Sequence, residues 1–221
     1  MIKQLIGIQS MAAALALCLP TYAATVYDNT AANLNTRLSA GSLEIGDQIL
    51  LAGTDRTLTS FTFQYYLQSP SAGDETLRLR FYRQDGLSGQ PGSLLFDSGA
   101  FSVPTTAGSS VQITDFASGV AVPLTTSLPD MFTWSVSFGG IGAGETGGVN
   151  LFGPPTIGNS VVDYWENDGA NWVNKRVDFG NPLIPTDFAA TVEAVPEPST
   201  IGLLLVGGAV VLIRFKSRRK Q

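Results

Sequence analysis

Hydrophobic and polar residues alternate along several stretches in the middle of the chain. From Phe61 to Leu67 every second residue is a large hydrophobic one, and Thr62, Gln64 and Tyr66 stand between them. A period of two places successive side chains on opposite faces of a β-strand, so that one face is buried and the other meets solvent. The same period predicts four further strands, at residues 77–82, 111–114, 132–138 and 188–193.

Turn-forming residues separate these stretches. Glycine, proline, aspartate and serine gather at residues 69–73, 84–86, 89–92, 139–142 and 153–155, and such residues favour tight turns. Between the two ends of the chain we find no long segment with the 3.6-residue period of a helix and no internal repeat. Many short strands joined by such turns predict an all-β fold, an antiparallel β-sandwich that is jelly-roll-like, over residues 24–194.

The N-terminal segment has the pattern of a signal peptide. Lys3 precedes an apolar run from Met11 to Leu19, and small residues follow at Ala23 and Ala24. Signal peptidase recognises a charged start, a short apolar core and a small residue before the cut, and the run is too short for a permanent membrane anchor. We expect residues 1–23 to be removed, with the cut after Ala23.

Three segments follow one another at the C-terminus. Residues 195–200 contain two prolines, residues 201–213 carry no charge, and a basic cluster follows that consists of Arg214, Lys216, Arg218, Arg219 and Lys220. An uncharged helix of this length rises only about 20 Å, which is short of the roughly 30 Å hydrocarbon core of a bilayer. The pattern predicts a C-terminal hydrophobic helix that spans the membrane marginally and keeps its basic end in the cytoplasm.

The order of these three segments resembles the PEP-CTERM sorting signal of Gram-negative bacteria. The resemblance covers Val195 to Gln221 and implies that Pro196, Glu197 and Pro198 are recognised by an exosortase, a membrane protease-transpeptidase. It also implies that the tail is removed from an inner-membrane intermediate and that the protein reaches the cell surface or extracellular matrix, in hosts that usually make exopolysaccharide. An ordinary tail anchor after a proline-rich linker is the alternative.

The middle domain resembles the β-sandwich domains commonly found ahead of PEP-CTERM tails. The similar stretches are residues 61–66, 80–82, 97–99 and 132–136. Those domains have no settled biochemical activity, so this resemblance supports the fold rather than a function.

Composition excludes several classes of chemistry. The chain has no histidine, and its only cysteine is Cys18, inside the expected signal peptide. The mature protein would then lack Ser-His-Asp and Cys-His catalysis, the usual zinc, haem and iron–sulfur ligands, and disulfides. Residues 24–194 hold 7 of the 13 basic and 17 of the 18 acidic residues, which gives a formal net charge of −10. Such a domain repels phosphate backbones, so we expect no nucleic acid partner.

The richest polar and aromatic stretch is residues 163–172. Four of its residues offer hard oxygen ligands for calcium, namely Asp163, Glu166, Asn167 and Asp168. Their spacing lacks the regular alternation of an EF-hand loop, and we expect no other cofactor. The alternative to a calcium site is a β-hairpin with residues 167–169 at its tip.

Aromatic residues of the same stretch indicate a second kind of site. Tyr164, Trp165 and Trp172 can stack on the apolar faces of sugar rings, while neighbouring carboxylates and amides bond the sugar hydroxyls. The alternative is that the tryptophans pack into the core. Elsewhere, Arg78 and Arg80 share the polar face of one strand, where we expect ion pairs with acids on a neighbouring strand.

Together these features predict an exported protein divided into residues 1–23, 24–194 and 195–221. We expect a structural or binding module that associates with exopolysaccharide, and not an enzyme. The alternative is a secreted carbohydrate hydrolase that uses two carboxylates, a chemistry that needs no histidine, but no local motif marks one pair among the 17 acids of the middle segment. A coat protein without a ligand is a third hypothesis.

Overall fold

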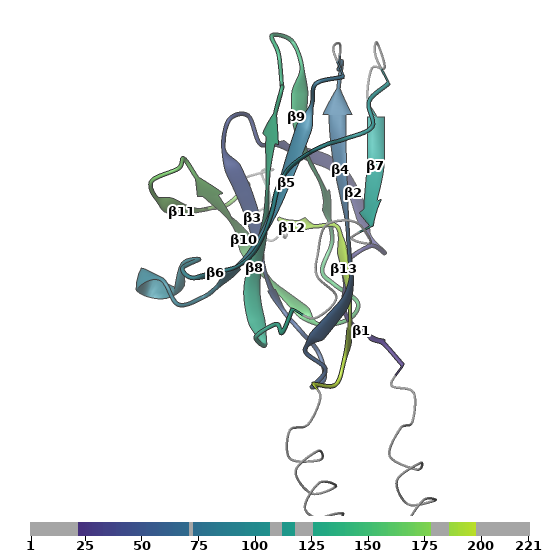
Figure 1. The fold of residues 1–221 in the computed structure, drawn as a ribbon, viewed down its shortest axis with the longest axis vertical. Helices are drawn as coiled ribbons and strands as arrows, with labels where there is room; N and C mark the ends of the chain where they lie inside the picture. Colours follow the sequence, from purple (N-terminus) through teal and green to yellow (C-terminus); the bar gives the residue numbers. More distant parts are fainter. Residues whose placement is uncertain (1–21, 71–72, 107–111, 118–125, 178–185, 198–221) are drawn as a thin grey trace, which may run out of the picture. The chain divides into compact units, whose positions relative to one another are not determined.

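The computed structural model describes residues 22–70, 73–106, 112–117, 126–177 and 186–197. Its strands form two antiparallel sheets that face each other as a sandwich (Figure 1). The prediction of an all-β antiparallel sandwich is therefore confirmed. The predicted C-terminal hydrophobic helix, and all but the last two residues of the predicted signal peptide, lie outside the described residues.

The first sheet has seven strands. Its main path runs through β1 (Ala24–Asp28), β13 (Ala190–Val195), β4 (Thr57–Gln68), β9 (Thr146–Phe152) and β12 (Asp187–Phe188), while β2 (Asn33–Ser39) pairs with β9 and β7 (Gln112–Ala117) pairs with β4. The first and last strands of the described domain are thus neighbours. The expected strands at 61–67, 111–114 and 188–193 correspond to β4, β7 and the pair β12 and β13.

The second sheet has six strands. Their order is β11 (Trp172–Lys175), β10 (Asn159–Asn167), β3 (Glu44–Leu50), β8 (Met131–Gly139), β5 (Thr76–Arg83) and β6 (Leu94–Ser102). A single 3₁₀ turn, η1 (Leu87–Gly89), lies between β5 and β6. The expected strands at 77–82 and 132–138 fall in β5 and β8. β10 and β11 form the hairpin considered as the alternative to a calcium loop, with Asn167 opposite Trp172.

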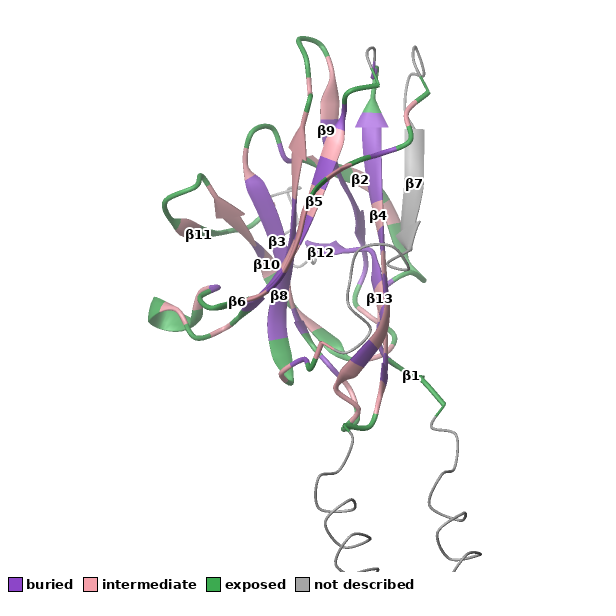
Figure 2. Ribbon diagram, viewed as in Figure 1, coloured by how far each residue is buried: buried purple, intermediate pink, exposed green. Residues whose placement is uncertain are grey.

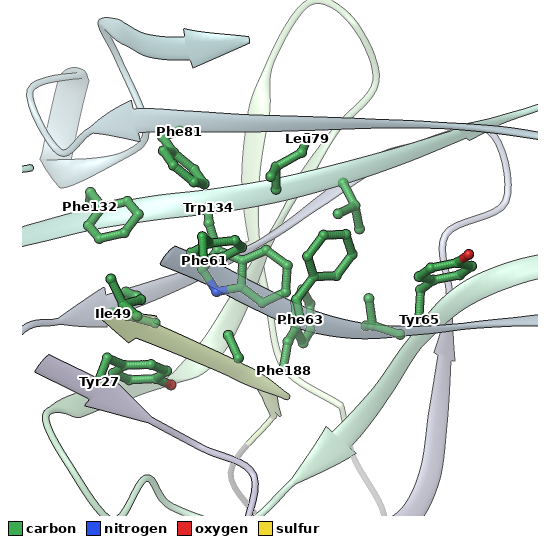
Figure 3. Close-up of a cluster of buried hydrophobic side chains, with 14 of the residues drawn as sticks. Tyr27, Ile49, Phe61, Phe63, Tyr65, Leu79, Phe81, Phe132, Trp134 and Phe188 are labelled. Atoms are coloured by element: carbon green, nitrogen blue, oxygen red, sulfur yellow. The ribbon is translucent and has the colours of Figure 1, made fainter. Parts of the chain in front are cut away.

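Aromatic side chains from both sheets fill the space between them. Trp134 of β8 is fully buried, and its ring centroid lies 5.3 Å from those of Phe61 and Phe63 and 5.7 Å from that of Phe188 (Figure 3). Phe61 also packs edge-on against Phe81, at 4.9 Å. The alternating hydrophobic residues of β4, β5 and β8 supply most of these rings, so the two-residue period correctly identified the buried face.

The opposite face of β8 differs from the expected pattern. Thr133 and Ser135 lie on the side expected to meet solvent, yet both are fully buried, and Figure 2 shows buried residues along β3, β4 and β8. Neighbouring polar side chains cover them, because Ser135 donates a hydrogen bond to Glu44 of β3 and Gln84 donates one to Thr133. The expectation of one buried and one wet face is wrong for β8, because a polar layer closes part of the outer face.

Replacing Trp134 with Ala is expected to lower the free energy of unfolding by about 3–5 kcal/mol, since it removes the largest ring of the core. Trp134→Phe should cost less, because the indole Nε1–H finds no hydrogen-bond partner among the described residues and an apolar ring removes this unsatisfied donor. Chemical denaturation of both variants measures the effect. The control is Val173→Ala, an exposed position where a change within about 0.5 kcal/mol is expected. Equal losses at Trp134 and Val173 would contradict a core centred on Trp134.

Candidate functional site

The outer face of the six-stranded sheet, which points away from the core, carries a group of polar and aromatic side chains. The strand register places Trp165, Gly46, Ser135 and Arg80 in one row across β10, β3, β8 and β5, and Gln48, Thr133 and Tyr82 in the next. We call the following side chains the outer-face cluster: Glu44, Gln48, Arg80, Tyr82, Ser135, Trp165 and Trp172. In Figure 1 the β10–β11 hairpin and the segment between β5 and β6 both extend away from the first sheet.

Glu44 lies at the centre of this cluster and is only 7% exposed. Its Oε1 accepts hydrogen bonds from the Tyr82 hydroxyl at 3.0 Å and from the Ser135 hydroxyl at 2.5 Å, and its Oε2 accepts one from Arg80 Nη1 at 2.5 Å. A buried carboxylate is tolerated when donors of this kind satisfy it. Burial and the charge of Glu44 raise the pKa of the Tyr82 hydroxyl, so it stays a donor.

Arg80 joins Glu44 to a second acid on the outer face. Its Nε lies 3.3 Å from Oδ2 of Asp97 on β6, and Arg78 also pairs with Asp97. This confirms the expected ion pairs with acids on a neighbouring strand. The hydrogen bond from Arg78 holds the pKa of Asp97 well below its usual range, so Asp97 stays ionised at neutral pH and does not supply a proton.

The two tryptophans of the sequence hypothesis both lie on this face. The ring of Trp172 packs edge-on against that of Tyr82, at a centroid distance of 5.2 Å. The Trp165 Nε1–H donates to Gln48 Oε1 at 3.2 Å, and the amide of Gln48 in turn contacts the sulfur of Met131. Both tryptophans are half-buried, so each ring is partly covered by the sheet and partly open to solvent.

Tyr164, the third aromatic residue of that hypothesis, lies on the other face of β10. It is 6% exposed, and its ring centroid is 6.2 Å from that of the core residue Phe188. Its hydroxyl donates to Glu166 Oε1 at 2.7 Å. Burial, then Glu166, raises the pKa of this hydroxyl. The structure therefore brings Trp165 and Trp172 together on one face and separates Tyr164 from them.

The four residues considered as calcium ligands are engaged separately. Asp163 pairs with Arg176 at 2.6 Å, and Glu166 accepts from Tyr164 and lies 3.9 Å from Lys175. At the hairpin tip, Asn167 accepts from the Gly169 N–H, and Asp168 accepts from two later N–H groups, which lower its pKa. No group of three or more acidic side chains within the described ranges is arranged to hold a metal ion.

A pair of buried carboxylates lies inside the sandwich, and the sequence analysis did not identify it. Asp47 of β3 is fully buried and accepts hydrogen bonds from the Ser160 hydroxyl at 3.0 Å and the Phe188 N–H at 2.9 Å. Asp187 of β12 is 2% exposed, and its Oδ1 has no hydrogen-bond partner among the described residues. The sequence did contain a sign of this buried acid. Asp47 alternates with Ile45 and Ile49, so it occupies a position that faces the core.

The two carboxylates influence each other's protonation. Burial raises the pKa of Asp187 to about 6. Burial, and then the charge of Asp187, raises the pKa of Asp47 well above its usual value, although the Phe188 N–H and Ser160 oppose this shift. Two buried like charges are costly, so the pair retains a proton under mildly acidic conditions.

The C-terminal segment of the chain matches a known family. Residues 194–220 match the PEP-CTERM protein-sorting motif, which confirms the resemblance of the tail. The motif implies an exosortase as the processing enzyme and export through the membrane to the cell surface. Pro196 and Glu197 are exposed, whereas Pro198 and the basic cluster (Arg214, Lys216, Arg218, Arg219 and Lys220) lie outside the described residues. In the part of the chain that the structure describes, no helix is long and apolar enough to cross a membrane.

Other comparisons say little about the sandwich. A search among curated proteins found no match. Two solved structures of infectious bursal disease virus, from the Gt and Gx strains, are similar at 16% and 15% identity, with TM-scores of 0.24 and 0.22. The matches cover 81% and 83% of this chain but only 41% and 42% of the viral chains, so this chain spans less than half of their length. A likeness this weak shows nothing about function.

Asp187→Asn is expected to reduce the loss of stability that accompanies rising pH. The folded-state pKa of Asp187, about 6, lies above that of an unfolded aspartate, roughly 3.9. The domain therefore binds more protons when folded, and this contribution is complete below about pH 4 and is lost as the pH rises through about 6. Denaturant unfolding of both proteins at pH 5 and pH 8 measures the effect. The informative quantity is the difference in unfolding free energy between the variant and the wild type at each pH, because the net negative charge also destabilises the wild type at high pH. Parallel pH curves would contradict a buried titrating pair.

Glu197→Ala is expected to leave unprocessed protein in the inner membrane, because the variant lacks the acidic residue of the Pro-Glu-Pro motif. Immunoblotting of membrane and extracellular fractions distinguishes precursor from mature protein. Glu193→Ala is the matched control, since this acid lies in β13, just before the matched residues. Normal release of the Glu197 variant would argue against recognition of the motif.

Proposed function

We propose that this exported protein is a surface or extracellular-matrix module of a Gram-negative bacterium that associates with exopolysaccharide through the outer-face cluster. One observation carries the proposal: Trp165 and Trp172 lie half-buried on a single face, beside the hydrogen-bonded network of Glu44 and Arg80. The sorting motif accounts for export and for the exosortase. Signal peptidase would remove the N-terminal segment during the same export.

The arrangement of this face suits a sugar polymer. Aromatic rings held by neighbouring side chains offer flat apolar surfaces at little entropic cost, and sugar rings present apolar faces of similar size. Trp172 is held by Tyr82, and Trp165 by its hydrogen bond to Gln48. Partly exposed charged groups, those of Arg78, Arg80 and Asp97, lie on the same face and can bond hydroxyl groups.

Charge favours a neutral polymer over an acidic one. On the outer face Arg78 and Arg80 are matched by Glu44 and Asp97 in ion pairs. The segment 24–194 as a whole carries a formal charge of −10, which repels a polyanion. We therefore expect retention of neutral exopolysaccharide with a weak dependence on salt.

The ion pairs and hydrogen bonds of the acidic residues on the outer face favour binding over hydrolysis. A two-carboxylate hydrolase needs one carboxylic acid that is protonated near neutral pH and a second that acts as base or nucleophile. On the outer face, Asp97 is held ionised by Arg78, and Glu44 accepts three hydrogen bonds. This supports a non-enzymatic role, with hydrolysis retained as an outcome of the test.

Trp172→Ala and Trp165→Ala are each expected to weaken binding of the mature protein to the host's exopolysaccharide about tenfold, as loss of an aromatic contact does. Val173→Ala is the matched control, because Val173 is exposed on the opposite face of β11, opposite Glu166. Affinity electrophoresis in the polysaccharide measures binding, and thermal melts show that each variant is folded.

Two results would overturn the proposal. The first is unchanged retention of both tryptophan variants. The second is shortening of the polysaccharide that disappears in Glu44→Gln, which would establish the hydrolase instead. Parallel gels with a neutral glucan and a uronic-acid polymer test the preference for neutral chains.

A further inference from the structure

The two ends of the folded domain are paired with each other. β1 runs antiparallel to β13, with Ala24 opposite Ala194 and Thr25 opposite Glu193. On its other side β13 pairs with β4, and this pairing continues to its last residue, Val195. The backbone of β13 is therefore paired on both sides up to Ala194, and with β4 alone at Val195, the residue before Pro196.

The side chains of β13 also belong to the core. Val192 and Ala194 are fully buried, and each lies opposite a fully buried residue of β4. Pro196 and Glu197, which follow directly, are exposed. Because proline lacks the N–H that would continue the ladder, the sheet ends where the Pro-Glu-Pro sequence begins. No linker separates the last strand from the sorting motif, whose match starts at residue 194.

We propose that the β1–β13 pair sets the boundary of sorting, so that the peptide bond cut by the exosortase lies C-terminal to Val195 and the mature protein keeps all of β13. In the cut, one C–N bond breaks, the acyl carbon passes to water or to an acceptor amine or hydroxyl, and the amine leaves with the tail after gaining a proton. The proposal rests on the sorting motif and the strand register, and it does not depend on glycan binding.

Strand pairing explains this boundary. A protease binds its substrate as an extended segment, so a residue inside a sheet must first leave its neighbours. For Ala194 that means losing the pairing with both β1 and β4 and exposing a buried side chain. Pro196 and Glu197 follow the end of the β13–β4 register and are exposed, so they are accessible while the domain stays folded.

The N-terminal processing site lies at the same end of this pair. A signal-peptidase cut after Ala23 leaves Ala24 as the first residue, and Ala24 is opposite Ala194. Both processing enzymes would then act at one end of a two-stranded ribbon. β1, the first segment of the mature protein, becomes the strand that protects the last one.

Intact-mass measurement of the mature protein, from full-length chain expressed in a host with the sorting enzyme, tests the boundary directly. The expected product begins at Ala24 and ends at Val195 or beyond. A C-terminus before Val195 would overturn the proposal, whatever the outcome of the glycan experiments.

Two variants of β1 test whether its pairing with β13 protects that strand from cleavage. Val26→Asp places a charge at a buried position of β1, and it is expected to speed hydrogen exchange of the β13 amides at least about tenfold and to yield additional C-termini within residues 190–194. Thr25→Lys, at an exposed position opposite Glu193, adds a favourable cross-strand pair and should keep one C-terminus.

A single unchanged C-terminus in Val26→Asp, despite faster exchange in β13, would contradict protection by β1. If that variant does not accumulate, Val26→Ala weakens the same contact to a smaller degree. Hydrogen exchange in β13 and the intact mass are then measured on Val26→Ala.

Discussion

Burial of aromatic rings between the two sheets is the interaction on which the rest of the molecule depends. Trp134 contacts rings from β4 and from Phe188 of β12, so residues far apart in the sequence converge on one ring. Only Ala189 separates Phe188 from β13, so the same packing fixes the strand that leads into the sorting motif. The opposite face of β8 contributes Ser135 to the outer-face cluster, whose other members lie on β3, β5, β10 and β11. The core thus positions both the candidate binding face and the C-terminal end of the domain.

The sequence predicted strands well where packing follows a local alternation, and poorly where a distant neighbour decides the residue type. The alternation around Phe61 and Phe63 identified β4. The glycine-rich stretch that contains Gly147 and Gly148 showed no such alternation, yet part of it forms β9. A Cβ atom on Gly148 would lie 2.0 Å from the carbonyl oxygen of Leu38. Glycine is required there by the close approach of β2, which no local pattern reveals.

The same limit applies to the candidate site. Trp165 and Trp172 could be selected from the sequence because they lie close together in one polar stretch. Glu44 could not, because it is one acid among many, and its partners Arg80 and Ser135 follow it by 36 and 91 residues. Only the register of β3, β8 and β5 brings these three side chains together. Asp47 was overlooked for a related reason, since its partner Asp187 arrives from a strand near the C-terminus.

The buried pair of Asp47 and Asp187 gives the domain a property that its composition conceals. Histidine is ordinarily the side chain that titrates near neutrality, and this chain has none. Because the pKa of Asp187 is raised to about 6, folding near that pH takes up a proton from the surroundings. We therefore expect the folding of this exported domain to depend on the acidity of the compartment it enters, through a carboxyl group that is only 2% exposed in the folded sandwich.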